Sequence, residues 1–124
     1  MWPVSTTDVF DEWFQALDEE ERAEIEAKVN LLELFGPALG RPHADTLNGS
    51  RFANMKELRA DVADHTLRIA FAFDPSRAAI LLVGGDKRGK PQKPFYRQLI
   101  AKADVLYAVH LGTMKKMTKK RGGK

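Results

Sequence analysis

Basic and aromatic side chains are interleaved in one segment of the sequence, between Asp86 and Lys102. Cations pair with phosphates and rings stack on unpaired bases, so this composition is typical of surfaces that bind single-stranded RNA. The simpler interpretation is a solvated loop that leads into a helix. We favour it for Phe95, whose inward packing leaves its neighbour Tyr96 pointing elsewhere. The basic residues of this segment are Lys87, Arg88, Lys90, Lys93, Arg97 and Lys102.

Two arginines are predicted to lie side by side on neighbouring strands. A two-residue turn at 63–64 would place Arg59 opposite Arg68, on a sheet face where the other side chains are small alanines. Adjacent guanidinium groups repel each other unless an anion joins them, and an open face with small side chains leaves room for one. An equally weighted alternative is a salt-bridged surface, in which Glu57 and Asp61 neutralise Arg59.

Complete motifs for metal binding, nucleophilic catalysis or nucleotide binding are absent from the sequence. The chain has no cysteine, which excludes a disulfide scaffold, a thiol nucleophile and a cysteine-ligated metal. Its histidines, His43, His65 and His110, do not have metal-ligand spacing. The stretch 84–87 is too short for a phosphate-binding loop and lacks the final serine or threonine. We therefore expect neither a metal nor another cofactor.

The 124 residues suit a single domain, and their charges are unevenly divided. Residues 1–33 carry a net charge of −8 and the remaining 91 residues a net charge of +11. A basic face of this kind is a candidate surface for nucleic acid. No apolar stretch is long enough to span a membrane and the first residues lack a signal-peptide pattern, so we expect a soluble, cytoplasmic protein.

Periodicity predicts an α+β domain in which a helical hairpin packs on a small, mostly antiparallel sheet. Two amphipathic helices are expected at about 8–17 and 18–35, the second starting with a capping box and ending at Gly36-Pro37. A loop is expected at 38–50. Residues 1–111 form the predicted domain, and 112–124 a basic, disordered tail. The expected strands are 2–5, 55–62, 67–73 and 78–83, and the last helix is 96–111.

Five short motifs follow one another with short spacing: Leu39-Gly40-Arg41-Pro42, Leu47-Asn48-Gly49-Ser50-Arg51, Lys56-Glu57-Leu58-Arg59, Leu67-Arg68-Ile69-Ala70-Phe71-Ala72-Phe73 and Leu81-Leu82-Val83-Gly84-Gly85-Asp86-Lys87. In this order they resemble the phage-associated HigB-like branch of the RelE/ParE toxin superfamily, over about Trp2 to Tyr107. The resemblance implies a RelE-like fold and the toxin of a type II toxin–antitoxin pair. RelE and HigB members cleave messenger RNA, generally on the ribosome, and a cognate antitoxin neutralises them.

The resemblance also assigns roles to individual residues. A strand arginine of RelE-type toxins contacts the scissile phosphate, and Arg68 occupies the matching position. Lys87 or Arg88 matches a basic residue that follows the last central strand, Tyr96 matches a tyrosine near the start of the final segment, and Arg59 matches a leucine–arginine pair. The residues expected to bind RNA are Lys56, Arg59, Lys90, Lys93 and Arg97.

One departure from the family pattern concerns the proton acceptor. The lysines that RelE carries upstream of the leucine–arginine pair fall here on Met55 and Glu57, and the one basic residue between them, Lys56, faces the other side of the strand. His65 or Tyr96 would have to substitute as the general base.

The implied function is a ribosome-dependent mRNA endoribonuclease that inhibits translation. The ribose 2′-hydroxyl would attack the adjacent phosphate without a cofactor or metal. The expected partners are an antitoxin with a helix-turn-helix domain, the ribosome and mRNA, with no membrane involved. Two alternatives stay open: a ParE-like, non-catalytic inhibitor of DNA gyrase, and a non-toxic RNA-binding protein.

Overall fold

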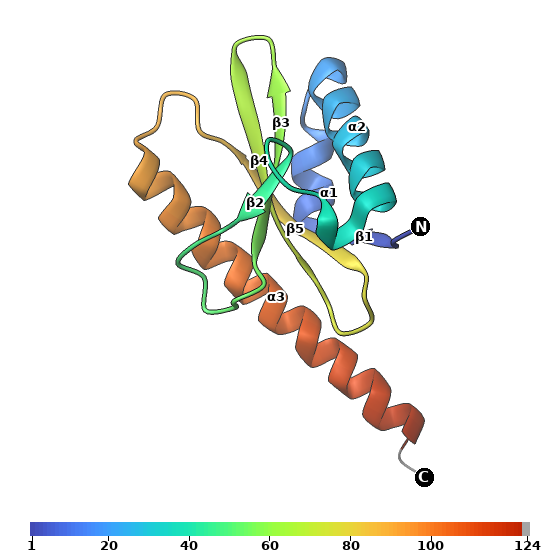
Figure 1. Ribbon diagram of the computed structural model, residues 1–124. Helices are drawn as coiled ribbons and strands as arrows, with labels where there is room; N and C mark the ends of the chain where they lie inside the picture. Colours follow the sequence, from blue (N-terminus) through green and yellow to red (C-terminus); the bar gives the residue numbers. More distant parts are fainter. Residues whose placement is uncertain (123–124) are drawn as a thin grey trace.

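The computed structural model describes residues 1–122, with residues 118–122 described by their backbone. A five-stranded sheet forms the middle layer (Figure 1). Helices α1 (Asp8–Gln15) and α2 (Glu19–Phe35) pack on one face of the sheet, and α3 (Gln92–Gly122) packs on the other. The predicted α+β class is confirmed. Within the described residues, none of the helices combines the length and the apolar character needed to cross a bilayer.

The helical hairpin begins at side-chain caps, as predicted. Thr7 Oγ1 accepts a hydrogen bond from the Phe10 amide (3.0 Å), and Asp18 and Glu21 form a reciprocal capping box at the start of α2. Gly36 then ends α2 and opens the short 3₁₀ helix η1 (Gly36–Ala38). The buried side chains of the hairpin, with Ile25 among them, form one core with the facing sheet residues.

The strands lie in the order β1 (Val4–Thr6), β5 (Ala79–Asp86), β4 (His65–Phe73), β3 (Lys56–Val62) and β2 (Ala44–Thr46). Strands β3, β4 and β5 form the predicted antiparallel meander, and β1 pairs with β5 in parallel. The turn at 63–64 sets the expected register, with Arg59 opposite Arg68. Strand β2 falls inside the predicted loop 38–50, because three residues are too few to show an alternating pattern.

Helix α3 covers most of the sheet face that carries Arg68. Ala70 and Ala72 are fully buried there, in a second core with Phe95 and Leu99 of α3. The prediction of an open face is therefore wrong over most of its length. The alanines give the helix backbone room to approach the sheet, and the space that the sequence assigned to a ligand is filled by α3.

The last helix is longer than predicted at both ends. It begins at Gln92 instead of Tyr96, and it continues through the basic segment to Gly122 instead of ending at Leu111. Residues 112–122, expected to be a disordered tail, are thus helical, and residues 123–124 of that tail lie outside the described residues. Lysine and methionine are good helix formers, so the segment needs few tertiary contacts to extend an existing helix.

Gly84 allows α1 to approach β5 closely, and we predict that enlarging it is destabilising. A Cβ atom at Gly84 would overlap the Trp13 ring, whereas one at Gly40 would meet nothing within 4 Å. Gly84→Ala should lower the free energy of unfolding by about 1–3 kcal/mol, as overpacked cores do. Gly40→Ala should change it by less than about 0.5 kcal/mol. Urea denaturation measures both, and equal effects of the two substitutions would contradict this packing.

Candidate functional site

A buried carboxylate, Glu57, joins the two predicted arginines. Its side chain is 6% exposed and lies on the α3 side of the sheet, between Arg59 and Arg68. Arg59 Nη2 is 3.3 Å from Glu57 Oε2, and Arg68 Nε is 3.8 Å from Glu57 Oε1. Tyr96 donates a 2.9 Å hydrogen bond from its hydroxyl to Glu57 Oε1. Of the two alternatives left open by the sequence, the salt-bridged one describes this resting arrangement, with Asp61 bonded to Thr66 rather than to Arg59.

Glu57 does not satisfy both arginines completely. Arg59 Nε and Arg68 Nε are buried and have no hydrogen-bond acceptor within the described part of the chain. Buried donors without acceptors are costly, so the cluster sets two cationic groups against one carboxylate with part of their hydrogen-bonding capacity unused.

The same cluster fixes the protonation of Tyr96. Burial, and then the hydrogen bond and negative charge of Glu57, raise the pKa of the Tyr96 hydroxyl above its ordinary value. Tyr96 is therefore a neutral proton donor at physiological pH rather than a base. Its ring also faces Arg68, whose guanidinium carbon lies 5.9 Å from the ring centroid.

Burial acts against the charge of Arg59, but the hydrogen bond and charge of Glu57 outweigh it and raise the pKa of Arg59. The arginine therefore stays cationic. Its side chain is 37% exposed and that of Arg68 is 14% exposed, so Arg59 is the more accessible of the two guanidinium groups.

The loop between β5 and α3 adds further cations next to Arg68. Arg68, Lys87, Arg88 and Lys90 line one shallow cavity of about 340 Å³, together with Asp64 and His65 at the β3–β4 turn. Arg88 is paired with Asp86 at 3.1 Å and with Asp64 at 3.4 Å. Within the described residues, no acidic side chain pairs with Lys87 or Lys90. The two lysines are therefore the cations of this cavity that are available to an anion.

The remaining predicted RNA-binding residues separate into two groups. Lys93 and Arg97 are exposed on the first turns of α3, one on each side of Tyr96 in the sequence. Lys56 lies on the hairpin side of β3, next to Leu58 in an alternating strand, and is therefore on the opposite face from Arg59. The structure brings Lys93 and Arg97 to the arginine side of the sheet and places Lys56 away from it.

His65 connects the β3–β4 turn to the helical hairpin. Its Nε2 lies 2.8 Å from Glu21 Oε2, and its Nδ1 lies 2.7 Å from Asp64 Oδ1. These two hydrogen bonds raise the pKa of His65, against the opposing effects of burial and then of the Arg88 guanidinium. Carboxylates at both ring nitrogens favour the doubly protonated imidazole, which has no lone pair to accept another proton. The same contacts tie the β3–β4 turn to the hairpin.

One group of side chains has the spacing of metal ligands. Glu21, His65 and Asp86 each bring a ligand atom within 4.8 Å of the others. The atoms of Glu21 and His65 are already hydrogen-bonded to each other, so a metal would have to displace that bond. The contact between Glu21 and His65 that joins the hairpin to the β3–β4 turn explains why these side chains lie close together.

Sequence reasoning missed the central position of Glu57, which it treated as one of two neighbours that neutralise Arg59 in the salt-bridged alternative. The signal was present in the strand pattern. Glu57 shares a strand face with Met55 and Arg59, so it points to the covered face, where an ionised side chain needs a partner. The sequence could not show that α3 returns to bury this face and brings Tyr96 to the carboxylate.

Comparisons with known proteins agree on a family and a fold. The profile of the family described as phage derived protein Gp49-like matches residues 12–108. HigB3, a candidate toxin of Mycobacterium tuberculosis, is 50% identical over 94 residues, which are 76% of this chain and 80% of HigB3. HigB2, a candidate toxin of the same organism, is 43% identical over 110 residues, which are 88% of this chain and 54% of HigB2.

Two solved structures share the fold at low sequence identity. One is the archaeal RelE–RelB complex from Pyrococcus horikoshii, with a TM-score of 0.53 and 13% identity, covering 71% of this chain and 97% of the other. The second is a double arginine-to-alanine mutant of the E. coli toxin RelE in its free state, with a TM-score of 0.56 and 9% identity, covering 82% and 95%.

The raised pKa of His65 predicts a pH-dependent contribution to stability. Stability gained from a raised histidine pKa is fully present below the unfolded-state pKa of about 6.5 and is lost as pH rises through the folded-state pKa. The wild-type protein should therefore be more stable than His65→Gln by a larger margin at pH 6 than at pH 9. Denaturant unfolding at both pH values measures the two margins. Equal margins would show that His65 is not held as a cation.

Proposed function

The chain belongs to the Gp49-like family, in the HigB-like branch of the RelE/ParE toxin superfamily, and from this premise we propose that it is the toxin of a type II toxin–antitoxin pair. In this proposal it inhibits translation in the cytoplasm as a ribosome-dependent mRNA endoribonuclease. Its partners are the ribosome with mRNA, and an antitoxin that carries a helix-turn-helix domain. The antitoxin is supported by the RelB partner present in the archaeal RelE structure.

The observation that carries the proposal is the cavity in which Arg68 lies with Lys87 and Lys90, two lysines that pair with no acidic side chain of the described residues. A phosphodiester in this cavity would accept from the guanidinium of Arg68, and Arg59 adds a second, more exposed guanidinium beside it. Lys87 and Lys90, in the same cavity as Arg68, would pair with the adjoining backbone phosphates. Arg68 and Lys87 are then placed to stabilise the additional negative charge that develops on the phosphorane.

The proposed reaction is a transesterification. The 2′-oxygen of the ribose forms a bond to phosphorus, the bond from phosphorus to the 5′-oxygen breaks, and the products are a 2′,3′-cyclic phosphate and a 5′-hydroxyl. One proton leaves the 2′-hydroxyl and one is delivered to the 5′-oxygen. Tyr96 keeps its proton at neutral pH and suits delivery to the leaving oxygen. Arg88 is the other proton donor that the resemblance implied.

Glu57 is the group best placed to accept the 2′ proton. Its carboxylate lies in a cluster with Arg59, Arg68 and Tyr96, and it releases a lone pair when substrate draws the tyrosine hydroxyl away. His65 lines the same cavity as Arg68 and Lys87, but both of its ring nitrogens are engaged by carboxylates, so we give it no part in proton transfer. Glu57 is largely buried, so it can accept a proton only from a precisely placed 2′-hydroxyl. Orientation of the RNA by the ribosome would therefore supply part of the rate enhancement.

Replacing Arg68 with alanine should strongly slow the cleavage of mRNA. We expect Arg68→Ala to reduce the rate of mRNA cleavage on purified ribosomes by about a hundredfold or more, since a charged contact to the developing phosphorane is lost. Arg68→Lys, which keeps the charge without the planar fork, should fall between Arg68→Ala and wild type. Arg41→Ala is the matched control, because Arg41 is exposed and, among the described residues, pairs with Asp45 alone. Primer extension on a translated message reports the cuts.

The folded state of the Arg68 variants is measured alongside. Because Arg68 is mostly buried and pairs with Glu57, Arg68→Ala should cost about 1–3 kcal/mol of stability and remain folded. A folded Arg68→Ala that cuts like wild type would place the active site elsewhere. If wild type fails to cut but blocks DNA supercoiling by gyrase, the ParE-like function replaces the nuclease.

The toxin assignment itself is tested by expression. Inducing this chain alone in bacteria should stop growth and amino-acid incorporation, and co-expression of the protein encoded next to it should restore both. The Arg68→Ala variant serves as the control for the burden of expression. Undiminished incorporation at high levels of folded wild-type protein would favour a non-toxic RNA-binding role.

A further inference from the structure

The far end of α3 extends beyond the sheet that it covers. Figure 1 shows the helix crossing the sheet and projecting past it toward the C-terminus. Its buried stripe runs through Leu99, Ala103 and Tyr107 and continues in Leu111 and Met114, which are only partly buried. These two side chains follow the spacing of the packed face but are less buried than the residues before them. The end of the apolar stripe is therefore only partly covered by the rest of the protein.

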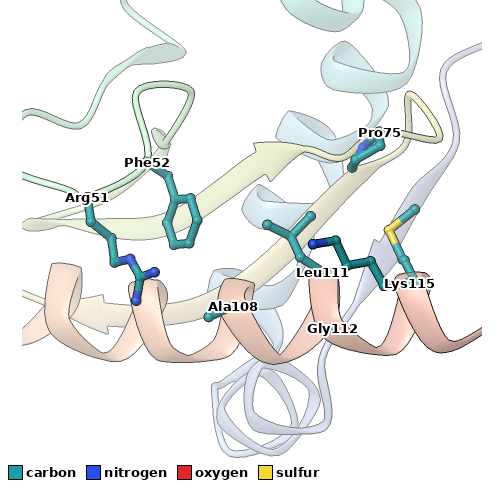
Figure 2. A pocket seen from close by; sticks show the side chains of 8 residues that line it. Arg51, Phe52, Pro75, Ala108, Leu111, Gly112 and Lys115 are labelled. Atoms are coloured by element: carbon teal, nitrogen blue, oxygen red, sulfur yellow. The ribbon is translucent and has the colours of Figure 1, made fainter.

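An apolar groove forms where this stripe emerges. Its floor is one face of α3, with Ala108, Leu111, Gly112 and Lys115, and its walls are the β2–β3 loop and the β4–β5 turn. Figure 2 shows Phe52 pointing from the loop toward α3 and Leu111 pointing up from the helix into the same space. The groove encloses about 810 Å³ and is open to solvent.

The lining of the groove suits a polypeptide better than a small polar ligand. Small-molecule sites combine apolar walls with several converging polar groups, whereas this lining consists mainly of apolar side chains with two basic ones, Arg51 and Lys115. A shallow apolar groove beside a helix is typical of sites that receive the apolar face of another helix.

The charged side chains that line the groove, Arg51 and Lys115, are both basic. Two acids of neighbouring elements already have partners: Asp74 is buried and bonded to His110 at 2.8 Å, and Asp104 accepts from the Arg51 amide at 3.1 Å. An occupant with acidic residues beside its apolar ones would therefore be matched in both respects.

We propose that this groove, lined by Arg51, Phe52, Pro75, Ala108, Leu111 and Lys115, is the docking site for an acidic, amphipathic helical segment of the antitoxin. The proposal rests on the proposed function, which supplies an antitoxin as the partner. The apolar residues of the segment lie over Phe52 and Leu111, and its acidic residues pair with Arg51 and Lys115.

The groove is distant from the arginine site. Tyr96 and Leu111 are both on α3, about 22 Å apart at a rise of about 1.5 Å per residue. Docking in the groove therefore leaves the cluster of Glu57, Arg59 and Arg68 in place. Affinity for the antitoxin and cleavage of RNA depend on different residues of this chain, so their mutational effects are separable.

The test uses full-length chain and the purified protein encoded by the neighbouring gene as the probe, with affinity measured on a biosensor. Leu111→Glu should weaken binding by about tenfold or more, and Lys115→Glu by about three- to tenfold. Val109→Glu and Lys116→Glu are the matched controls, since both residues are exposed on the same turns of α3 and do not line the groove. The controls should change affinity by less than about twofold.

Further measurements identify other occupants. Circular dichroism verifies that Leu111→Glu is folded. Lys115 is exposed, so Lys115→Glu tests the groove even if Leu111→Glu fails to fold.

Unchanged affinity in both groove variants, with a loss in Lys87→Glu, would place the antitoxin on the arginine site and overturn the proposal. Loss of ribosome co-sedimentation in Lys115→Glu, with antitoxin affinity intact, would make the occupant ribosomal RNA. A dimeric wild type that Leu111→Glu makes monomeric would make it a second copy of this chain.

Failure of the partner is distinguishable from failure of the groove. If the neighbouring protein does not bind wild type at all, the docking proposal falls with the partner, while ribosome-dependent cleavage by wild type would still support the nuclease. Leu111→Glu and Lys115→Glu should cut mRNA on the ribosome at the wild-type rate. Loss of cleavage in both folded variants would show that the groove belongs to the RNA-binding surface and would overturn the proposal.

Discussion

The Glu57 carboxylate holds the arginine site together. Without it, Arg59 and Arg68 would be adjacent cations on neighbouring strands, partly removed from water and repelling each other. The carboxylate also receives the Tyr96 hydroxyl, which ties the first turns of α3 to β3. The neutralisation is incomplete, because within the described residues neither Nε donor has an acceptor. A single buried carboxylate thus lets the two cations lie side by side, and the proposed anion binding draws on the positive charge that remains.

The position of this cluster follows from how α3 packs on the sheet. The helix can lie close to the sheet only where the facing side chains are small, as at Ala70 and Ala72. Larger charged side chains lie under its first turns, and there the cluster and the cavity with Lys87 form. At its other end the helix extends past the sheet, and its apolar stripe forms the floor of the groove beside Phe52. The packing of this one helix generates both proposed functional surfaces, at its opposite ends.

The hairpin carries most of the acidic residues and is fixed to the opposite face of the sheet. His65, bonded to Glu21 and Asp64, links it to the turn that sets the pairing of Arg59 with Arg68. The acids therefore lie mainly on one side and the available bases on the other. This separation favours approach of a polyanion to the arginine side, and it disfavours contact of RNA with the hairpin.

Local patterns in the sequence determined the elements and the pairing of the arginines. The caps at Thr7 and Asp18, the period of the strands and the two-residue turn at 63–64 act over short stretches, so they can be recognised without the fold. The order of motifs also identified the family. These features place Arg59 and Arg68 together before any tertiary contact is known.

Tertiary structure decided what surrounds the pair. The sequence allowed either an open, anion-binding face or a salt-bridged one, and predicted space beside Ala70 that α3 fills. Whether Glu57 is buried, where Tyr96 points and what His65 touches depend on elements distant in the chain. Burial of a charge is a property of the assembled layers, because it is the helix packed over the strand that removes the carboxylate from water.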